Sequence, residues 1–327
     1  MPRPSNGLAP GAGWVRVPAS TSNLGSGFDC IGLALARYLT AEFVPGGTAG
    51  TTRLERQGTL RAIDRVGDHD DIFFRAFRKR LRTLGIAHPG GSVTIDSEIP
   101  VGRGLGSSAA AVVGGLALAS VVAGEPVPRE PAAVRAVLAD ALEWESHLDN
   151  VAPALMGGLV GVAHDGSGEP HAFRLPLAAS IAFAYAAPGV ELETTKARTA
   201  LPRTVPFGDA VHNLGALAAL TTALATGTAE LVALGLADKL HVPYRLPLIP
   251  GAVEAFAAAR SAGAWGVTIS GAGSGVIALA APDRAFDVAD AMAAAFRTAV
   301  GPSGVVFFAV QPDLVGVTGG QGSRKSS

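Results

Sequence analysis

Apolar and polar positions along the 327-residue chain follow two different spacings. Strand-like apolar runs or alternation occur at residues 14–17, 31–44 and 92–99, while residues 72–84 repeat apolar side chains at helical spacing with arginines on the opposite face. The same criteria predict further helices and strands downstream: helices from Ser107 and over 131–145, 193–201, 209–226, 229–236, 251–262 and 284–300, and strands over 265–270, 276–281 and 304–310. Strands and helices mixed in this order predict an α+β fold.

Two glycine clusters flank an apolar strand within residues 157–168, and the composition changes there. A domain boundary at this point predicts an N-terminal domain over 14–165 and a C-terminal domain over 166–312. Residues 1–13 are rich in Pro, Gly and Ala and lack the apolar core of a signal peptide, so we expect a disordered leader. Residues 313–327 end in Gly, Ser, Arg and Lys and are expected to form a disordered tail.

Charge and hydropathy exclude several classes of protein. The formal net charge of −1 leaves no basic field for nucleic acid or an anionic membrane, so a phosphate ligand must be held by local design. The longest apolar stretch, 109–124, contains glycines and falls short of the roughly 20 residues that span a bilayer. Cys30 is the only cysteine, which excludes an internal disulfide and fits a reducing compartment. We therefore expect a cytoplasmic protein that binds neither nucleic acid nor membrane.

The most informative stretch is a glycine-rich loop before the helix predicted at Ser107. Gly102, Gly104 and Gly106 can adopt positive φ angles and let a ligand approach the backbone closely. The helix N-terminus offers free N–H groups and the positive end of its dipole, which suits a nucleotide's phosphates. No lysine precedes the serine pair, so this is not a Walker A loop, and the spacing is not that of a dinucleotide fingerprint. The glycines alone would fit a serine-capped turn equally well.

The whole string from Pro100 to Ala111 resembles the phosphate-binding motif of the GHMP kinases, a family that includes galactokinase, homoserine kinase and mevalonate kinase. The resemblance implies ATP as the nucleotide and contacts to its phosphates from Pro100, Gly102, Arg103, Gly104, Leu105, Gly106, Ser107, Ser108, Ala109 and Ala110. It also implies a two-domain fold, with ATP near the cleft between the domains. The N-terminal domain would be ribosomal-protein-like with a left-handed β-α-β unit, and the C-terminal domain a ferredoxin-like α/β sandwich.

Residues 269–275 resemble the third motif of that family and imply further phosphate contacts from Gly271 and Gly273. The chain departs from the motif at its end. The family usually has proline after the second glycine, often followed by threonine or serine, where this chain has Ser274 and Gly275.

Residues 145–153 resemble the family's His-x-Asp-Asn-Val-Ala-Pro segment. An acidic group just upstream would complete Mg²⁺ coordination with Ser108, and either Glu143 or Glu145 could supply it; the family pattern favours Glu145. Mg²⁺ prefers hard oxygen ligands, usually one or two from protein together with phosphate and water. The resemblance also implies that Asn150 and His147 orient the substrate hydroxyl. We expect no obligatory general base and a smaller role for the neighbouring Asp149.

Three segments bear on the substrate. Residues 18–29, 194–202 and 241–245 each resemble segments of homoserine kinases. The resemblance implies that the α-carboxylate of L-homoserine is gripped by two arginines and that the rest is held by a threonine, an asparagine and an aspartate: Arg198, Arg245, Thr194, Asn23 and Asp29. Guanidinium groups form forked, charge-assisted bonds with carboxylates, and a carboxylate in the same pocket would balance the substrate's ammonium.

Two other functions stay open at this point. One is a GHMP kinase with another acceptor, such as mevalonate or shikimate. The other is a catalytically silent member of the fold that acts as a regulator. The adenine-binding residues, feedback control and oligomeric state are not readable from the sequence, although a homodimer would fit the family.

Overall fold

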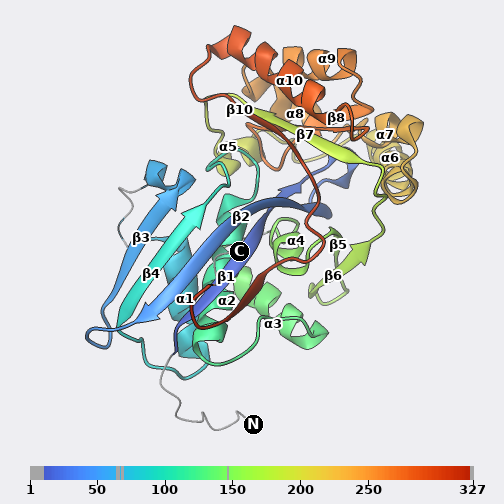
Figure 1. The fold of residues 1–327 in the computed structure, drawn as a ribbon. Coiled ribbons are helices and arrows are strands. Elements are labelled where there is room, and N and C mark those ends of the chain that lie inside the picture. The colour runs from blue at the N-terminus through green and yellow to red at the C-terminus, as the bar shows by residue number, and fades with distance from the viewer. Residues whose placement is uncertain (1–10, 64–66, 68–69, 146, 325–327) are drawn as a thin grey trace.

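Two β-sheets organise the chain in a computed structural model that describes residues 11–63, 67, 70–145 and 147–324. One sheet has seven strands and the other has four. Figure 1 shows strands β1 to β4 of the seven-stranded sheet in blue to green, with the four-stranded sheet and its helices at one end of it. Nearly all of the predicted leader, residues 1–10, lies outside the described residues.

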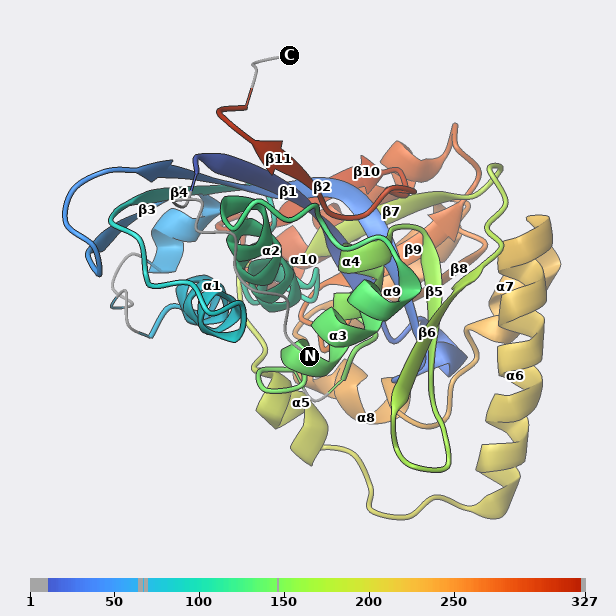
Figure 2. The same ribbon diagram turned by 90° about the horizontal axis from the view of Figure 1, so that it is seen from below.

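The seven-stranded sheet has the order β11-β1-β2-β4-β3, with β5 paired to β2 and β6 paired to β5. Strands β3 and β4 are parallel, and α1 connects them, so they form the expected β-α-β unit. Figure 2 shows α1, α2 and α3 on one face of this sheet. The elements of this half are β1 Gly13–Ser22, η1 Gly25–Gly27, β2 Ile31–Pro45, β3 Thr52–Gly58, η2 Thr59–Ile63, α1 Ile72–Thr83, β4 Gly91–Ser97, α2 Ser107–Val122, α3 Pro131–Ala141, α4 Val151–Met156, β5 Leu159–His164, β6 Pro170–Leu175 and β11 Thr318–Gln321.

Helix α2 is the centre of this half because its sequence is apolar on every side. From Ala109 onward all its residues are buried, and small residues allow neighbouring elements to approach closely. A side chain at Gly115 would lie 2.2 Å from the carbonyl oxygen of Phe73 in α1. Helix α1 begins where predicted, because the Asp71 carboxylate caps it by accepting the Phe74 N–H at 3.1 Å.

The four-stranded antiparallel sheet has the order β10-β7-β9-β8. If β7, β8, β9 and β10 are numbered 1 to 4 in chain order, their order across the sheet is 4-1-3-2. Helices lie between β7 and β8 and between β9 and β10. This is the predicted ferredoxin-like arrangement. Its elements are β7 Ala182–Ala187, α5 Thr194–Thr199, α6 Phe207–Thr226, α7 Ala229–Gly235, α8 Val242–Arg245, η3 Leu246–Leu248, α9 Ala252–Ser261, β8 Gly266–Ile269, β9 Val276–Ala280, α10 Ala285–Val300 and β10 Val306–Val310.

The predicted tail is wrong over its described part, because residues 318–321 form strand β11. This strand pairs antiparallel with β1, matching Gly13 with Gln321 and Arg16 with Thr318. Asp313 fixes the approach by accepting the N–H groups of two residues that follow it, Val315 and Gly316. A glycine-rich composition suggested disorder, but β1 would otherwise expose an unpaired edge, and the tail supplies its partner.

Two predicted boundaries also need correction. The division between residues 165 and 166 falls inside the hairpin of β5 and β6, and both strands belong to the seven-stranded sheet. Helix α3 ends at Ala141 instead of Glu145, and the residues after it form turns. Freed from the helix, Glu145 can face α2 while Glu143 faces the other way, as described below.

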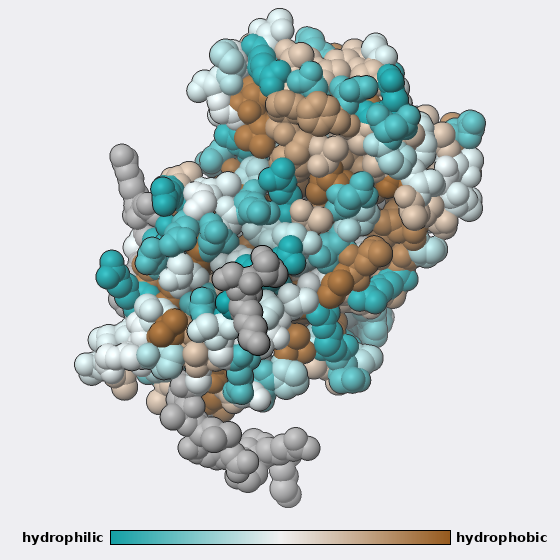
Figure 3. Space-filling model, in the orientation of Figure 1, coloured by the Kyte–Doolittle hydropathy of each residue, from teal (hydrophilic) through white to brown (hydrophobic). Residues whose placement is uncertain are grey.

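The two sheets meet where β1 ends. Gly25 donates its N–H to Thr268 Oγ1 at 3.2 Å, and Gly271 donates to the Ser22 carbonyl at 3.0 Å. On the face drawn in Figure 1, polar and apolar residues are interspersed (Figure 3). No helix among the described residues is long and apolar enough to cross a membrane.

Candidate active site

The glycine-rich loop before α2 depends on its glycines. Gly102, Gly104 and Gly106 have φ angles of 67°, 73° and 65°, a region that side chains disfavour. A side chain at Gly104 would lie 1.9 Å from the carbonyl oxygen of Ser270, and one at Gly106 would lie 2.1 Å from Ser20 Oγ. The sequence therefore makes a loop that packs against β1 and the 269–275 turn with no room for larger residues.

The amides of this loop are open. The N–H groups of residues 104–109 donate to no acceptor within the described parts of the chain, and Ala110 makes the first bond, to the Gly106 carbonyl. Free N–H groups at a helix start bind anions, because their donors and the helix dipole both favour negative charge. This row of amides has the chemistry predicted for a phosphate site.

Ser108 and Glu145 lie together at the start of α2. The Ser108 hydroxyl donates to Glu145 Oε1 at 2.5 Å. Burial raises the pKa of Glu145, and the Ser108 hydrogen bond partly offsets this. Glu143 instead forms an ion pair with Lys79 on the outer surface. Of the two acids that the sequence left open, Glu145 is therefore the one beside Ser108.

These two oxygen donors fit Mg²⁺, which takes one or two protein oxygens when phosphates and water supply the rest. The described residues contain no cluster of three or more His, Cys, Asp or Glu side chains that could hold a metal by themselves.

Asp29 and Arg198, predicted to hold opposite ends of a substrate, bind each other. Arg198 donates to both Asp29 oxygens, at 2.8 and 2.6 Å. Asn23 positions Asp29 by accepting its backbone N–H at 2.9 Å, and donates its own amide to the Gly271 carbonyl at 3.0 Å. The pair brings α5 to the loop after β1 across 169 residues of sequence.

Arg245 is fully buried and has a different environment. Its guanidinium donates to the carbonyls of Ala197 and Gly271, at 3.3 and 3.4 Å, and lies 5.0 Å from the centre of the Phe28 ring. No carboxylate of the described residues lies within salt-bridge distance of it. Burial and then Arg198 lower the pKa of Arg245 to about 10, so the group still carries its charge at neutral pH. It is a buried cation without an anionic partner in contact.

Phe28 is a residue that sequence reasoning missed. Its ring lies under two guanidinium groups, those of Arg198 and Arg245, at 5.3 and 5.0 Å, and stacks on His241 at 4.8 Å. An aromatic face attracts cations, so the ring helps hold two like charges close together. Its position directly before Asp29 was the available signal.

Asn150, His147 and Asp149 line the same pocket. Asn150 accepts from Ser20 Oγ at 3.1 Å and donates to Ser22 Oγ at 2.8 Å, which fixes its amide. His147 Nδ1 lies 3.6 Å from Asp29 Oδ2, and burial lowers the pKa of this histidine although Asp29 opposes the effect.

Asp149 is buried, and its Oδ2 has no hydrogen-bond partner among the described residues. Burial, followed by the negative charge of Asp29, raises the pKa of Asp149 to about 7.

A cavity of about 450 Å³ joins these groups. The sequence predicted most of its lining: Asn23, Gly102, Arg103, Gly104, Gly106, Ser107, Ser108, Ala109, Glu145, His147, Asp149, Asn150, Thr194, Arg198, Arg245, Gly271 and Gly273. Pro100, Leu105 and Ala110 do not line it, and Asp29 reaches it through its bond to Arg198. The lining that was not predicted includes Thr195 and Thr199, whose spacing of four on α5 is a helical-face signal.

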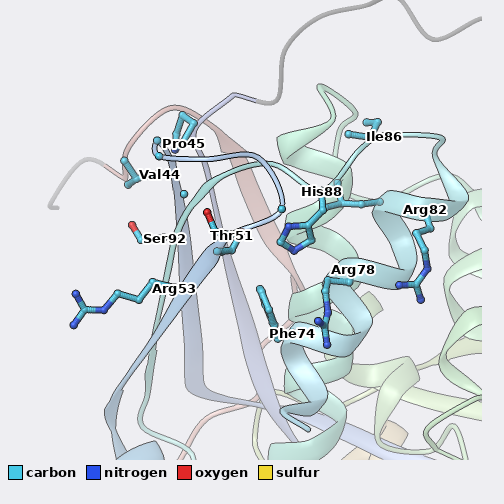
Figure 4. Close-up of a pocket in the computed structure, with 16 residues that line it drawn as sticks. Val44, Pro45, Thr51, Arg53, Phe74, Arg78, Arg82, Ile86, His88 and Ser92 are labelled. Atoms are coloured by element: carbon cyan, nitrogen blue, oxygen red, sulfur yellow. The ribbon is translucent and has the colours of Figure 1, made fainter. Parts of the chain in front are cut away.

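A second, apolar cavity of about 230 Å³ adjoins the first, because Gly102, Ser107 and Ser108 line both. Its walls come from Leu60, Ile72 and other apolar side chains. A larger groove, of about 1010 Å³, lies elsewhere between the β2–β3 connection and α1. Figure 4 shows Phe74 and His88 in that groove; none of the predicted site residues line it.

Comparisons with known proteins show the family of the chain. Residues 71–158 match the family described as GHMP kinases N terminal domain, and residues 212–298 match the one described as GHMP kinases C terminal. The chain belongs to the GHMP kinases, a family of ATP-dependent small-molecule kinases.

Its relatives within that family are homoserine kinases. The chain is 39% identical over 286 residues to the homoserine kinase of Prochlorococcus marinus (strain MIT 9303), covering 86% of this chain and 88% of that protein. It is 40% identical over 288 residues to that of Parasynechococcus marenigrum (strain WH8102), covering 87% and 89%. The crystal structure of homoserine kinase from Cytophaga hutchinsonii superposes with a TM-score of 0.82 at 28% identity, covering 94% of this chain and 97% of that one.

Proposed function

We propose that this protein is a homoserine kinase, which transfers the γ-phosphoryl group of ATP to the hydroxyl of L-homoserine and releases ADP. The observation that carries the proposal is the row of open amides at residues 104–109, next to a pocket lined by two arginines. Arg245 has no carboxylate of the described residues in contact, and Arg198 binds the Asp29 carboxylate. The open amides suit the triphosphate, and the mixed charges suit an amino acid.

The Asp29–Arg198 pair favours a zwitterionic acceptor. An amino acid can exchange with this pair without leaving a charge alone, because its ammonium takes Asp29 while its carboxylate takes Arg198 and Arg245. Mevalonate or shikimate would bring a carboxylate only, and Asp29 would lose its partner in a partly buried site. Leaving a buried charge without a partner costs several kcal/mol.

The nucleotide fits the two adjoining cavities. In this proposal the apolar cavity holds the adenine, and the lining that it shares with the main pocket supports phosphates bound over the start of α2. The site predictions for Gly271 and Gly273 place the 269–275 turn beside these phosphates. Mg²⁺, bound to Ser108 and Glu145, would neutralise charge on the phosphate oxygens.

Phosphoryl transfer needs little covalent chemistry from the protein, so positioning and charge stabilisation account for most of the catalysis. Asn150, fixed by Ser20 and Ser22, orients the acceptor hydroxyl for in-line attack, and His147 supports the neighbouring Asp29. The proposal includes no obligatory general base. Thr194, at the start of α5, contacts the body of the substrate.

The test is an acceptor panel with the purified full chain, ATP and Mg²⁺. ADP release is coupled to a spectroscopic assay, and the product is identified by ³¹P NMR. We expect O-phospho-L-homoserine and at least a 100-fold lower kcat/KM for mevalonate and shikimate. Turnover of mevalonate but not L-homoserine would refute the substrate. Tight nucleotide binding with no turnover of any acceptor would instead favour a silent regulator.

A cytoplasmic location and a homodimer stay predictions. Size-exclusion chromatography with light scattering would decide the second.

A further inference from the structure

Three successive carbonyl groups of the phosphate-site loop are held from outside the loop. Tyr185 donates its hydroxyl to the Arg103 carbonyl at 2.6 Å, and Ser270 Oγ donates to the Gly104 carbonyl at 2.6 Å. The backbone N–H of Ser20 donates to the Leu105 carbonyl at 3.2 Å. These three donors come from β7, the 269–275 turn and β1, so both sheets hold the loop.

Holding a carbonyl also sets the direction of the next N–H group. In a planar trans peptide the C=O of one residue and the N–H of the next point in opposite directions. Fixing the carbonyls of residues 103, 104 and 105 therefore aims the amides of 104, 105 and 106 away from β7, the turn and β1. Those are three of the open amides of the phosphate site.

Tyr185 is well placed to be a rigid part of this arrangement. It is fully buried in β7, and its ring stacks on Phe308 at 5.0 Å. Burial raises the pKa of its hydroxyl, so this group remains a donor at any working pH. Arg103 is anchored in addition by its side chain, which donates to the Gly304 carbonyl before β10.

Gly275 explains a departure from the family motif. A side chain at this position would lie 2.3 Å from Tyr185 Oη and 2.5 Å from the Arg103 carbonyl oxygen. Only glycine leaves room for the hydroxyl–carbonyl bond here. The neighbouring Ser274 turns away, donating its hydroxyl to the Val190 carbonyl at 2.5 Å. Of the two residues that differ from the family pattern, Gly275 therefore accommodates the contact between Tyr185 and the loop.

We propose that Tyr185, which lies outside every motif of the site, is a positioning residue for nucleotide binding: its hydroxyl fixes the Arg103–Gly104 peptide so that the Gly104 amide faces the phosphates. This inference rests on the proposed function only for the identity of the nucleotide. It means that a residue of the four-stranded sheet contributes to the affinity for ATP. Tyr185 touches neither substrate, and it acts through the loop.

The test removes one oxygen atom. Tyr185→Phe keeps the ring and its stacking on Phe308 but frees the Arg103 carbonyl to turn toward the ligand. We expect the dissociation constant for MgADP, measured by calorimetry, to rise about five- to tenfold, because a hydrogen bond of this kind contributes about 1 kcal/mol. The KM for ATP should rise by a similar factor. KM for L-homoserine should change less than twofold. Ser270→Ala should shift the same constants in the same direction.

Tyr38→Phe is the matched control, because Tyr38 also donates its hydroxyl to one partner, Asp313 at 3.0 Å, and lines neither cavity of the site. It should lower the melting temperature without changing nucleotide affinity. If Tyr185→Phe lowers the melting temperature like the control but binds MgADP as the wild type does, Tyr185 is merely structural and the inference is wrong. If wild-type protein itself fails to bind MgADP, the failure lies in the proposed function.

Discussion

The free energy of unfolding of Asp149→Asn, measured relative to wild type at the same pH, should increase as the pH rises. The Asp149 side chain is buried, one of its oxygens lacks a partner among the described residues, and its pKa is raised from 3.8 to about 7, chiefly by burial and then by Asp29. The folded state thus keeps a proton that the unfolded state releases above pH 4. Wild-type stability is therefore lost as pH rises from about 4 to about 7.

The size of this effect follows from the pKa difference. A difference of about three in pKa corresponds to about 4 kcal/mol once both states are ionised. Of this total, the loss in wild-type stability that falls between pH 5 and pH 8 is about 2–3 kcal/mol. Asparagine has nearly the same shape and no titration, so the variant should lack this part of the pH dependence.

Urea unfolding of wild type and Asp149→Asn at intervals from pH 5 to pH 8.5 measures the free energy of unfolding of each protein and its dependence on pH. Titrating groups that do not interact with Asp149 cancel in the difference between the two proteins, and any fixed cost of the asparagine amide adds no pH dependence. We expect the variant to gain about 2–3 kcal/mol over wild type between pH 5 and pH 8. A difference independent of pH, or one that grows toward acid, would refute the reasoning. In the kinase assay, Asp149→Asn should reduce kcat less than Asn150→Ala does.

Three further outcomes follow from the site. Glu145→Gln should lower kcat by about 100-fold and raise the Mg²⁺ concentration needed for half-maximal rate, whereas Glu143→Gln, which alters only the surface pair with Lys79, should leave both unchanged. Arg245→Met should raise KM for L-homoserine by about 10- to 100-fold with little change in KM for ATP, because a charge-assisted bond to the substrate contributes about 1.5–3 kcal/mol; equal changes in both constants would contradict its role. Gly106→Ala combines a left-handed φ of 65° with a 2.1 Å contact to Ser20 Oγ, so it should raise KM for ATP at least tenfold and lower the melting temperature by several degrees; unchanged ATP kinetics would show that the loop tolerates a side chain.

Local sequence signals predicted the helices whose ends are set by neighbouring residues in the sequence. Helix α1 was predictable because Asp71 caps it and its apolar residues repeat on one face, and α2 because a glycine loop leads directly into small apolar residues. The chemistry of the phosphate loop was predictable for the same reason, since ten neighbouring residues contain most of it. The choice between Glu143 and Glu145 needed the end of α3, which apolar spacing placed four residues too late.

Long-range pairing was not predictable in this way. The Asp29–Arg198 bond joins residues 169 positions apart, and each residue alone resembles an ordinary surface charge. Tyr185 lies in an apolar strand, where its hydroxyl gives no signal until β7 is placed beside the loop. The tail was misjudged because composition reports what a segment can do alone and does not report the edge that β1 offers it.

That edge has a consequence for how the protein is made. A ribosome delivers β1 about 300 residues before β11, so the nascent chain carries β1 with one side unpaired until residue 321 has emerged. The guanidinium of Arg129 then donates to the carbonyls of Val315 and Val317, which secures the returning segment just before β11. The seven-stranded sheet is therefore completed only after the four-stranded sheet has been translated. Premature termination would leave β1 with an unpaired edge that can pair with other chains and cause aggregation.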